Sequence, residues 1–109
     1  MKRERFEQLV HEAITDLPEE FRSRLENVVI IVEEHHPDED LFGLYEGTPL
    51  TERGSEPPLF PDRIYIYQEP IEEESENDAE IRREVQLTIM HEIAHFFGIE
   101  DDVLEDLGY

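Results

Sequence analysis

The sequence predicts a small α+β domain in which helices pack against one mixed sheet of three or four strands. Three observations predict it: a helical apolar pattern near the amino end, strand-like apolar runs in the middle, and a long apolar helical segment near the carboxyl end. The 109 residues suffice for one hydrophobic core but not for two, so residues 1–109 are expected to form a single domain.

The amino-terminal part predicts two helices and a strand. Apolar residues at helical spacing predict a first helix that Pro18 ends: Phe6, Leu9, Val10, Ala13, Ile14 and Leu17. Residues 18–25 predict a short second helix, with Pro in its first turn. The β-branched run Asn27–Glu33 predicts a central strand that is buried on both faces.

The middle of the chain predicts two further strands separated by a long loop. Residues 41–47 form a short segment bounded by Gly, and residues 62–68 alternate aliphatic and aromatic side chains. Between them, residues 48–61 contain four Pro and predict a loop. Long loops in small domains are often functional.

The carboxyl-terminal part predicts the longest helix. Residues 69–80 contain seven acids and no basic residue, which predicts a solvated connection. Ile81–Phe97 is expected to be helical, with Gly98 ending the helix, and residues 102–107 can form one last short helix.

The charge balance excludes several classes of partner. Thirty acidic residues face nine basic ones, giving a net charge of -21, and no basic stripe is present for nucleic acid. Anionic membrane surfaces are disfavoured for the same reason. One Lys among the nine basic residues fits a high-salt habitat, with plain solubility as the alternative.

No segment predicts export or insertion into a membrane. The charged amino terminus is followed by an amphipathic stretch, not by the continuous apolar core of a signal peptide. The apolar runs are far shorter than the roughly 20 residues that span a bilayer. We therefore expect a cytoplasmic protein.

The stretch HEIAH contains the candidate chemistry. Because Cys is absent, a transition-metal site must use His and carboxylate ligands. On a helix, His91 and His95 project about 40° apart, one turn above the other, so both imidazoles can reach one ion. Glu92 lies beside them as a carboxylate able to take a proton from water, which is the arrangement of a zinc hydrolase.

Residues after the helix strengthen this interpretation. Gly98 permits a sharp turn, and Asp101 is then placed to offer a third ligand, with Asp102 and Glu105 as alternatives. Such a set leaves a fourth zinc position open to water. HExxH alone arises by chance in a few per cent of chains of this composition, whereas the pattern with Gly98 and Asp101 arises in roughly one in ten thousand.

The alternative for HEIAH is a pair of hydrogen-bonded core histidines. The helix is expected to be nearly surrounded, so its two His and one Glu would face inward, where unpaired polar groups are costly. That cost favours a metal over the core alternative.

Other polar and aromatic residues have less specific interpretations. His35 and His36 are expected in an exposed loop, where help in binding metal or substrate is the less favoured option, and His11 is expected on a helix surface. Tyr109 is a candidate for stabilising an oxyanion, although packing is favoured, and Tyr45 and Tyr65 are expected to pack on the sheet.

The stretch HEIAHFFGIEDDVLEDLGY resembles the extended HExxHxxGxxH/D zincins. With FGLYEG at 42–47 and PDRIYIY at 61–67, the chain looks like the small bacterial minimal zincin family over roughly residues 25–109. The resemblance implies a minimal zincin-like fold around an active-site helix. It also implies a zinc cofactor, with His91, His95 and Asp101 as metal ligands and Glu92 as catalytic base.

Two functions compete on this basis. The first is a zinc-dependent metallopeptidase that acts on a peptide or protein, which would pair with an exposed strand edge at residues 42–46. The second is a metal-binding zincin-fold protein without significant peptidase activity, acting as an interaction or regulatory module. A metal-dependent RNA hydrolase is disfavoured by the charge of -21. Imidazole and carboxylate ligands also accept Mn²⁺, Fe²⁺ and Ni²⁺.

Overall fold

The computed structural model describes residues 1–47 and 61–97. Gly98, Asp101, Asp102, Glu105 and Tyr109 lie outside the described residues, as does the predicted helix at 102–107. The described elements are, in chain order, α1 (Arg3–Thr15), α2 (Glu19–Arg22), a 3₁₀ turn (Ser23–Leu25), β1 (Val28–Glu33), β2 (Gly43–Glu46), β3 (Asp62–Tyr67), α3 (Gln68–Glu73) and α4 (Asp78–Phe97).

The described strands form one mixed sheet in the order β1–β3–β2. β1 runs parallel to β3, with Ile30 opposite Ile64, and β2 runs antiparallel to β3, with Tyr45 opposite the same Ile64. The predicted α+β class and the small mixed sheet are confirmed.

The prediction that Asn27–Glu33 is a central strand was wrong. β3 occupies the centre of the sheet, and β1 lies at an edge, where Val29 is 43% exposed. The apolar run serves only one buried face, because Val28, Ile30 and Val32 pack against the core while Val29 points away from it. A run of β-branched residues therefore did not require burial on both faces.

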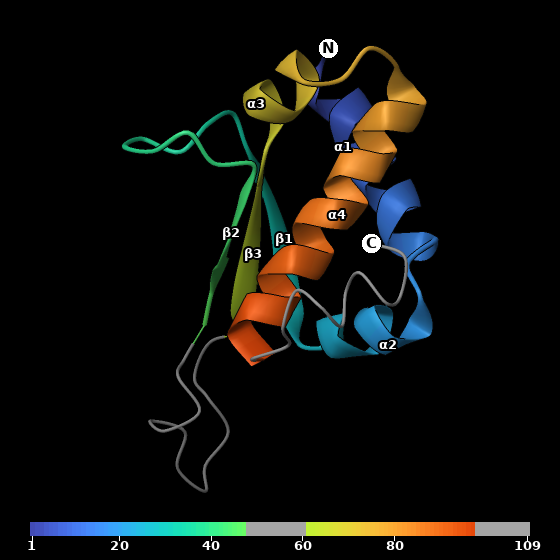
Figure 1. Ribbon diagram of the computed structural model, residues 1–109, viewed down its shortest axis with the longest axis vertical. Helices are drawn as coiled ribbons and strands as arrows, with labels where there is room; N and C mark the ends of the chain where they lie inside the picture. Colours follow the sequence, from blue (N-terminus) through green and yellow to red (C-terminus); the bar gives the residue numbers. More distant parts are fainter. Residues whose placement is uncertain (48–60, 98–109) are drawn as a thin grey trace, which may run out of the picture.

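Helices α1 and α4 lie together on one side of the sheet (Figure 1). α4 contacts β2 and β3 directly, and α1 packs on α4. The core between them contains fully buried side chains from all these layers: Phe6, Leu9, Ala13, Ile64, Ile66, Ile71, Val85, Ile89, Ile93 and Ala94. The buried apolar face of α4 contains Ile81, Val85, Ile89, Met90 and Ile93.

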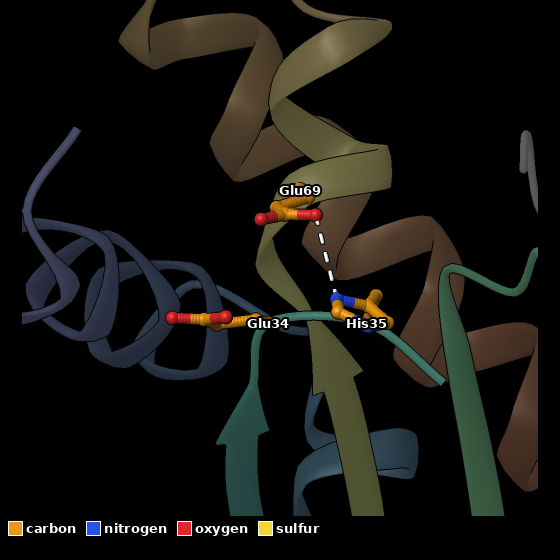
Figure 2. Close-up of side chains that lie close together, drawn as sticks. All are labelled: Glu34, His35 and Glu69. Carbon is orange, nitrogen blue, oxygen red and sulfur yellow. Dashed lines mark ion pairs between the residues drawn. The ribbon is translucent and has the colours of Figure 1, made fainter. Parts of the chain in front are cut away.

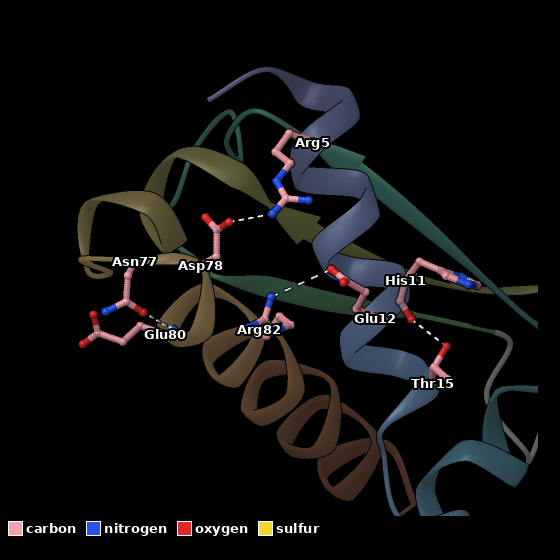
Figure 3. A network of polar contacts seen from close by, with 8 residues as sticks. All are labelled: Arg5, His11, Glu12, Thr15, Asn77, Asp78, Glu80 and Arg82. Carbon is pink, nitrogen blue, oxygen red and sulfur yellow. Dashed lines mark hydrogen bonds and ion pairs between the residues drawn. The ribbon is translucent and has the colours of Figure 1, made fainter.

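Polar contacts fix α4 relative to α1 (Figure 3). The Arg5 guanidinium donates to the Asp78 carboxylate at 2.6 Å, and Arg82 lies 3.9 Å from Glu12. Asn77 caps α4, because its side-chain oxygen accepts the backbone N–H of Glu80 at 2.9 Å. This cap explains why the helix begins at Asp78, before the predicted start at Ile81.

The prediction of a solvated connection at residues 69–80 was wrong in its first half. α3 forms at Gln68–Glu73, with Ile71 fully buried and Pro70 also buried. The Gln68 side-chain amide donates to the backbone carbonyl of Met1 at 2.9 Å, which ties α3 to the amino end of the chain. Pro70 is tolerated because the first turn of a helix needs no intrahelical N–H donors.

In the part of the chain that the structure describes, none of the helices combines the length and the apolar character needed to cross a membrane.

Candidate metal centre

His91 and His95 lie one turn apart near the carboxyl end of α4. Their ring centroids are 6.5 Å apart, with 57° between the ring planes. His91 is half-buried and His95 is exposed. The two imidazoles therefore lie on one side of the helix and remain open to solvent.

The expectation that these side chains face inward from a nearly surrounded helix was wrong. Ile89, Met90, Ile93 and Ala94 occupy the buried side of this part of α4, which leaves the histidine side at the surface. Within residues 1–47 and 61–97, neither imidazole has a hydrogen bond or an ion pair. These described surroundings do not support the alternative of hydrogen-bonded core histidines.

Glu92 is half-buried and contacts the sheet edge. Its Oε2 accepts a hydrogen bond from the backbone N–H of Tyr45 on β2 at 3.2 Å. The backbone N–H of Tyr67 donates to the Phe42 carbonyl, so residues 42 and 67 form a hydrogen-bonded pair. Antiparallel pairs alternate, so the backbone groups of Gly43 and Tyr45 point away from β3, toward the outer edge of β2.

Gly43 permits the close approach of α4 to β2. A Cβ atom at this position would lie 2.5 Å from Cγ2 of Thr88 and 2.9 Å from the backbone oxygen of Tyr65. Only Gly fits there without displacing the helix or the strand. Thr88 lies one turn before Glu92, so this contact brings Glu92 within reach of the edge.

Sequence reasoning did not identify Gly43 as part of the site. The available signal was a Gly inside a short strand, which often marks close backbone approach. The predictions that Tyr45 and Tyr65 pack on the sheet are confirmed. Tyr45 packs against the core and its hydroxyl donates to Asp62 at 2.8 Å, while the Tyr65 ring lies parallel to Tyr67 at 6.3 Å.

The donor set in the described residues fits a zinc ion. Two imidazoles on one side of a helix and a neighbouring carboxylate are ligands and base of the kind that zinc hydrolases use. The third predicted ligand, Asp101, lies outside the described residues. Among the described residues, His91 and His95 lie with ring centroids 6.5 Å apart and Glu92 contacts the edge strand, but these three are not a group whose ligand atoms all lie within 4.8 Å of one another.

A second group of metal-ligating side chains lies after β1 (Figure 2). One potential ligand atom from each of Glu34, His35 and Glu69 lies within 4.8 Å of the others, and His35 Nδ1 is 3.5 Å from Glu69 Oε2. All three residues are exposed, and exposed groups of this kind are common without an ion. We therefore regard the group as a surface ion pair with an additional carboxylate.

The predicted exposure of three histidines outside the motif is confirmed for two of them. His11 and His35 are exposed, whereas His36 is half-buried. The His36 ring meets Tyr67 edge-on, with centroids 5.8 Å apart, which accounts for its burial.

Of three comparisons with known proteins, the one with family models agrees with the resemblance seen in the sequence. A search among curated proteins found no match. Among solved structures, a conserved hypothetical protein from T. thermophilus is 19% identical, with a TM-score of 0.49 over 91% of this chain and 100% of the other. A family model described as Zincin-like metallopeptidase matches residues 25–109. Because this match covers most of the chain, the protein belongs to the Zincin-like metallopeptidase family.

Proposed function

We propose that the protein is a zinc-dependent peptidase in which His91, His95 and Asp101 hold the metal and Glu92 is the general base. Family membership supports zinc peptidase chemistry in general. The observation that carries the specific proposal is the position of Glu92, one residue after His91 and hydrogen-bonded to the edge strand at 3.2 Å. This geometry supports Glu92 as a general base that lies next to a metal ligand on one side and next to a strand edge for peptide binding on the other.

Zinc bound by these residues would polarise a carbonyl and lower the pKa of water toward neutrality. The chain itself supplies proton transfer through Glu92. Its Oε2 accepts the Tyr45 N–H, which orients the carboxylate, and Oε1 has no hydrogen-bond partner among the described residues. Oε1 is thus available to take a proton from water and later to deliver it to the leaving amine.

The outer edge of β2 supports an extended peptide as substrate. β2 is a terminal strand of the described sheet, and Gly43 and Tyr45 direct their backbone groups outward, although the Tyr45 N–H already donates to Glu92. An extended chain can add to such an edge through main-chain hydrogen bonds. Its carbonyl groups would then pass close to Glu92, because Glu92 already contacts the Tyr45 N–H.

One observation favours the alternative of a metal-binding module without significant peptidase activity. His95 is exposed and His91 only half-buried, so solvent reaches the imidazole pair. Electrostatic stabilisation of a transition state is strongest in sites from which water is excluded. A surface metal centre would bind its ion while contributing less to catalysis.

Incubation of the zinc-loaded protein with a diverse peptide library, followed by mass spectrometry of new peptide termini, separates the two functions. The peptidase proposal predicts cleavage that disappears after chelation and returns when zinc is restored. An intact library, with about one zinc retained per chain, would exclude the peptidase and support the binding module.

A further inference from the structure

A small cleft opens on the face of the sheet away from the core helices. Ile64 and Ile66 of β3 are fully buried against the helices, so the alternating Tyr65 and Tyr67 lie on the opposite face. The cleft has a volume of about 290 Å³. The lining residues on which its chemistry depends are Glu33, His36, Leu44, Glu46, Tyr65 and Tyr67.

The aromatic walls of the cleft are held in fixed orientations. The rings of Tyr65 and Tyr67 are parallel to within 5°, with centroids 6.3 Å apart, and His36 meets Tyr67 edge-on at 88°. His36 Nδ1 accepts the backbone N–H groups of Asp38 and Glu39 at 3.1 Å and 3.0 Å. These two bonds fix the orientation of the imidazole. Because Nδ1 is the acceptor, Nε2 carries the proton in the neutral ring.

The charged side chains that line the cleft are carboxylates. Glu33 and Glu46 are each about half exposed, and none of the described lining residues is Lys or Arg. Burial raises the pKa of Tyr67, and the nearby Tyr65, Glu33 and Glu46 raise that pKa further. The charged groups that line the cleft beside its aromatic rings therefore include the carboxylates of Glu33 and Glu46.

The carboxylates already have basic neighbours on the strands. Glu46 forms an ion pair with Arg63, and Glu33 lies 3.8 Å from Arg3. The Arg3 guanidinium donates a hydrogen bond to the Val32 carbonyl, and its distance to the Glu33 carboxylate is correspondingly long. Glu33 thus remains able to accept a hydrogen bond from an incoming cation.

We propose that this cleft binds an arginine side chain presented by a protein partner. A planar guanidinium can stack on a tyrosine face and donate hydrogen bonds to carboxylates at the same time. The net charge of -21 would attract a basic partner over a longer range. The inference does not rest on the proposed peptidase activity.

The surroundings of the cleft favour a protein over a free small cation. Val29 is 43% exposed on the same sheet face, and Ile31 stands opposite Tyr65 in the register. An apolar area beside a charged anchor position is typical of protein interfaces. The cleft itself is at the lower limit of volumes for small-molecule sites.

Titration of the ¹⁵N-labelled full chain with the peptide acetyl-Gly-Arg-Gly-amide, followed by NMR, tests the anchor directly. We expect saturable shifts of the amide signals of the lining residues Glu33, His35, His36, Leu44, Glu46, Tyr65 and Tyr67. The same peptide with citrulline in place of arginine keeps the shape but removes the charge, and it should not saturate. Equal binding of the citrulline peptide, or shifts confined to other surfaces, would overturn the proposal.

Matched protein variants distinguish the cleft from the general negative charge. Glu33→Gln should weaken arginine binding about two- to fivefold, whereas Glu7→Gln on exposed α1 removes the same charge and should change it less than about 1.5-fold. Tyr65→Leu should weaken binding and Tyr65→Phe should retain it, because Phe keeps the ring. Circular dichroism checks folding. Equal losses in Glu33→Gln and Glu7→Gln would refute a built site.

The partner itself is tested with a folded protein that carries one exposed arginine within an apolar surface. We expect this protein to bind at least tenfold more tightly than the tripeptide and to lose that gain when Val29 is changed to Ser. A tripeptide and a protein of equal affinity would show that the cleft recognises free small cations, which would contradict the proposed protein partner.

Discussion

The backbone N–H of Tyr45 donates a hydrogen bond to the side chain of Glu92, which lies 47 positions later in the chain, at 3.2 Å. This contact joins the outer edge of β2 to α4. It also places the carboxylate at the outer edge of β2, where we propose that a peptide docks. The helix and the edge strand therefore act as one structural unit around the candidate metal centre.

Gly43→Ala tests how closely that unit is packed. The new methyl group would meet Cγ2 of Thr88 and the backbone oxygen of Tyr65. We expect a loss of about 1–3 kcal/mol in the free energy of unfolding, measured by urea denaturation, because overpacking forces the helix away from the strand.

Thr88→Ser provides the matched second change, because it removes the methyl group that the new side chain would meet. In the double variant we expect partial recovery of stability, since the contact with the Tyr65 backbone remains. A Gly43→Ala variant as stable as the wild type would contradict the close approach.

The buried side of α4 and the open face of the sheet differ in how much of a valine side chain they cover, and two Val→Ala variants measure that difference. Val85 of α4 is 0% exposed, whereas Val29 of β1 is 43% exposed. Val85→Ala should cost about 2 kcal/mol of unfolding free energy through loss of buried contacts and a residual cavity. Val29→Ala should cost less than about 1 kcal/mol. Equal costs in thermal or urea denaturation would show that the open face is covered in solution.

Because of Tyr67, we expect the folding stability to depend on pH in the alkaline range. Burial, assisted by Tyr65, Glu33, Glu46 and Glu92, raises its pKa above the ordinary value of 10.0. Above about pH 10 the unfolded chain ionises this group first, so the folding stability falls as the pH rises from about 10 toward the raised pKa. Below about pH 10 this group does not affect the stability.

Tyr67→Phe removes the ionisable group with little change in shape. Denaturation midpoints of this variant and of the wild type should keep a constant difference between about pH 7 and pH 9. Above about pH 10 the wild type should lose stability more steeply. Parallel curves across the whole range would refute the raised pKa.

The sequence predicted the long helix and its candidate metal ligands because both depend on local spacing. His91 and His95 lie on one side of α4, as residues at a spacing of four on a helix must, and Glu92 projects about 100° from His91. The degree of burial was not predictable, since it depends on which neighbouring elements cover that side. Asp101 remains a prediction, because it lies outside the described residues.

Long-range arrangements were the part that the sequence did not reveal. The apolar run of β1 indicated a strand, but strand order depends on connections between distant segments, and β3 took the centre. α3 was not predicted, because its many acidic residues indicated a solvated connection. In the structure, the buried Ile71 and Pro70 anchor it. The approach of Gly43 to Thr88 joins residues 45 positions apart; a Gly inside a short strand signals a close approach but does not identify the partner.

Glu92→Gln tests the central claim most directly, with zinc content and peptide hydrolysis measured on the same sample. The substitution keeps the shape of the side chain but removes its ability to take a proton, so zinc should remain near one per chain while kcat falls about 10²- to 10⁴-fold. Glu84→Gln, on the same helix two turns earlier, should leave both quantities unchanged. A zinc-loaded Glu92→Gln protein that cleaves peptide at the wild-type rate would contradict the account.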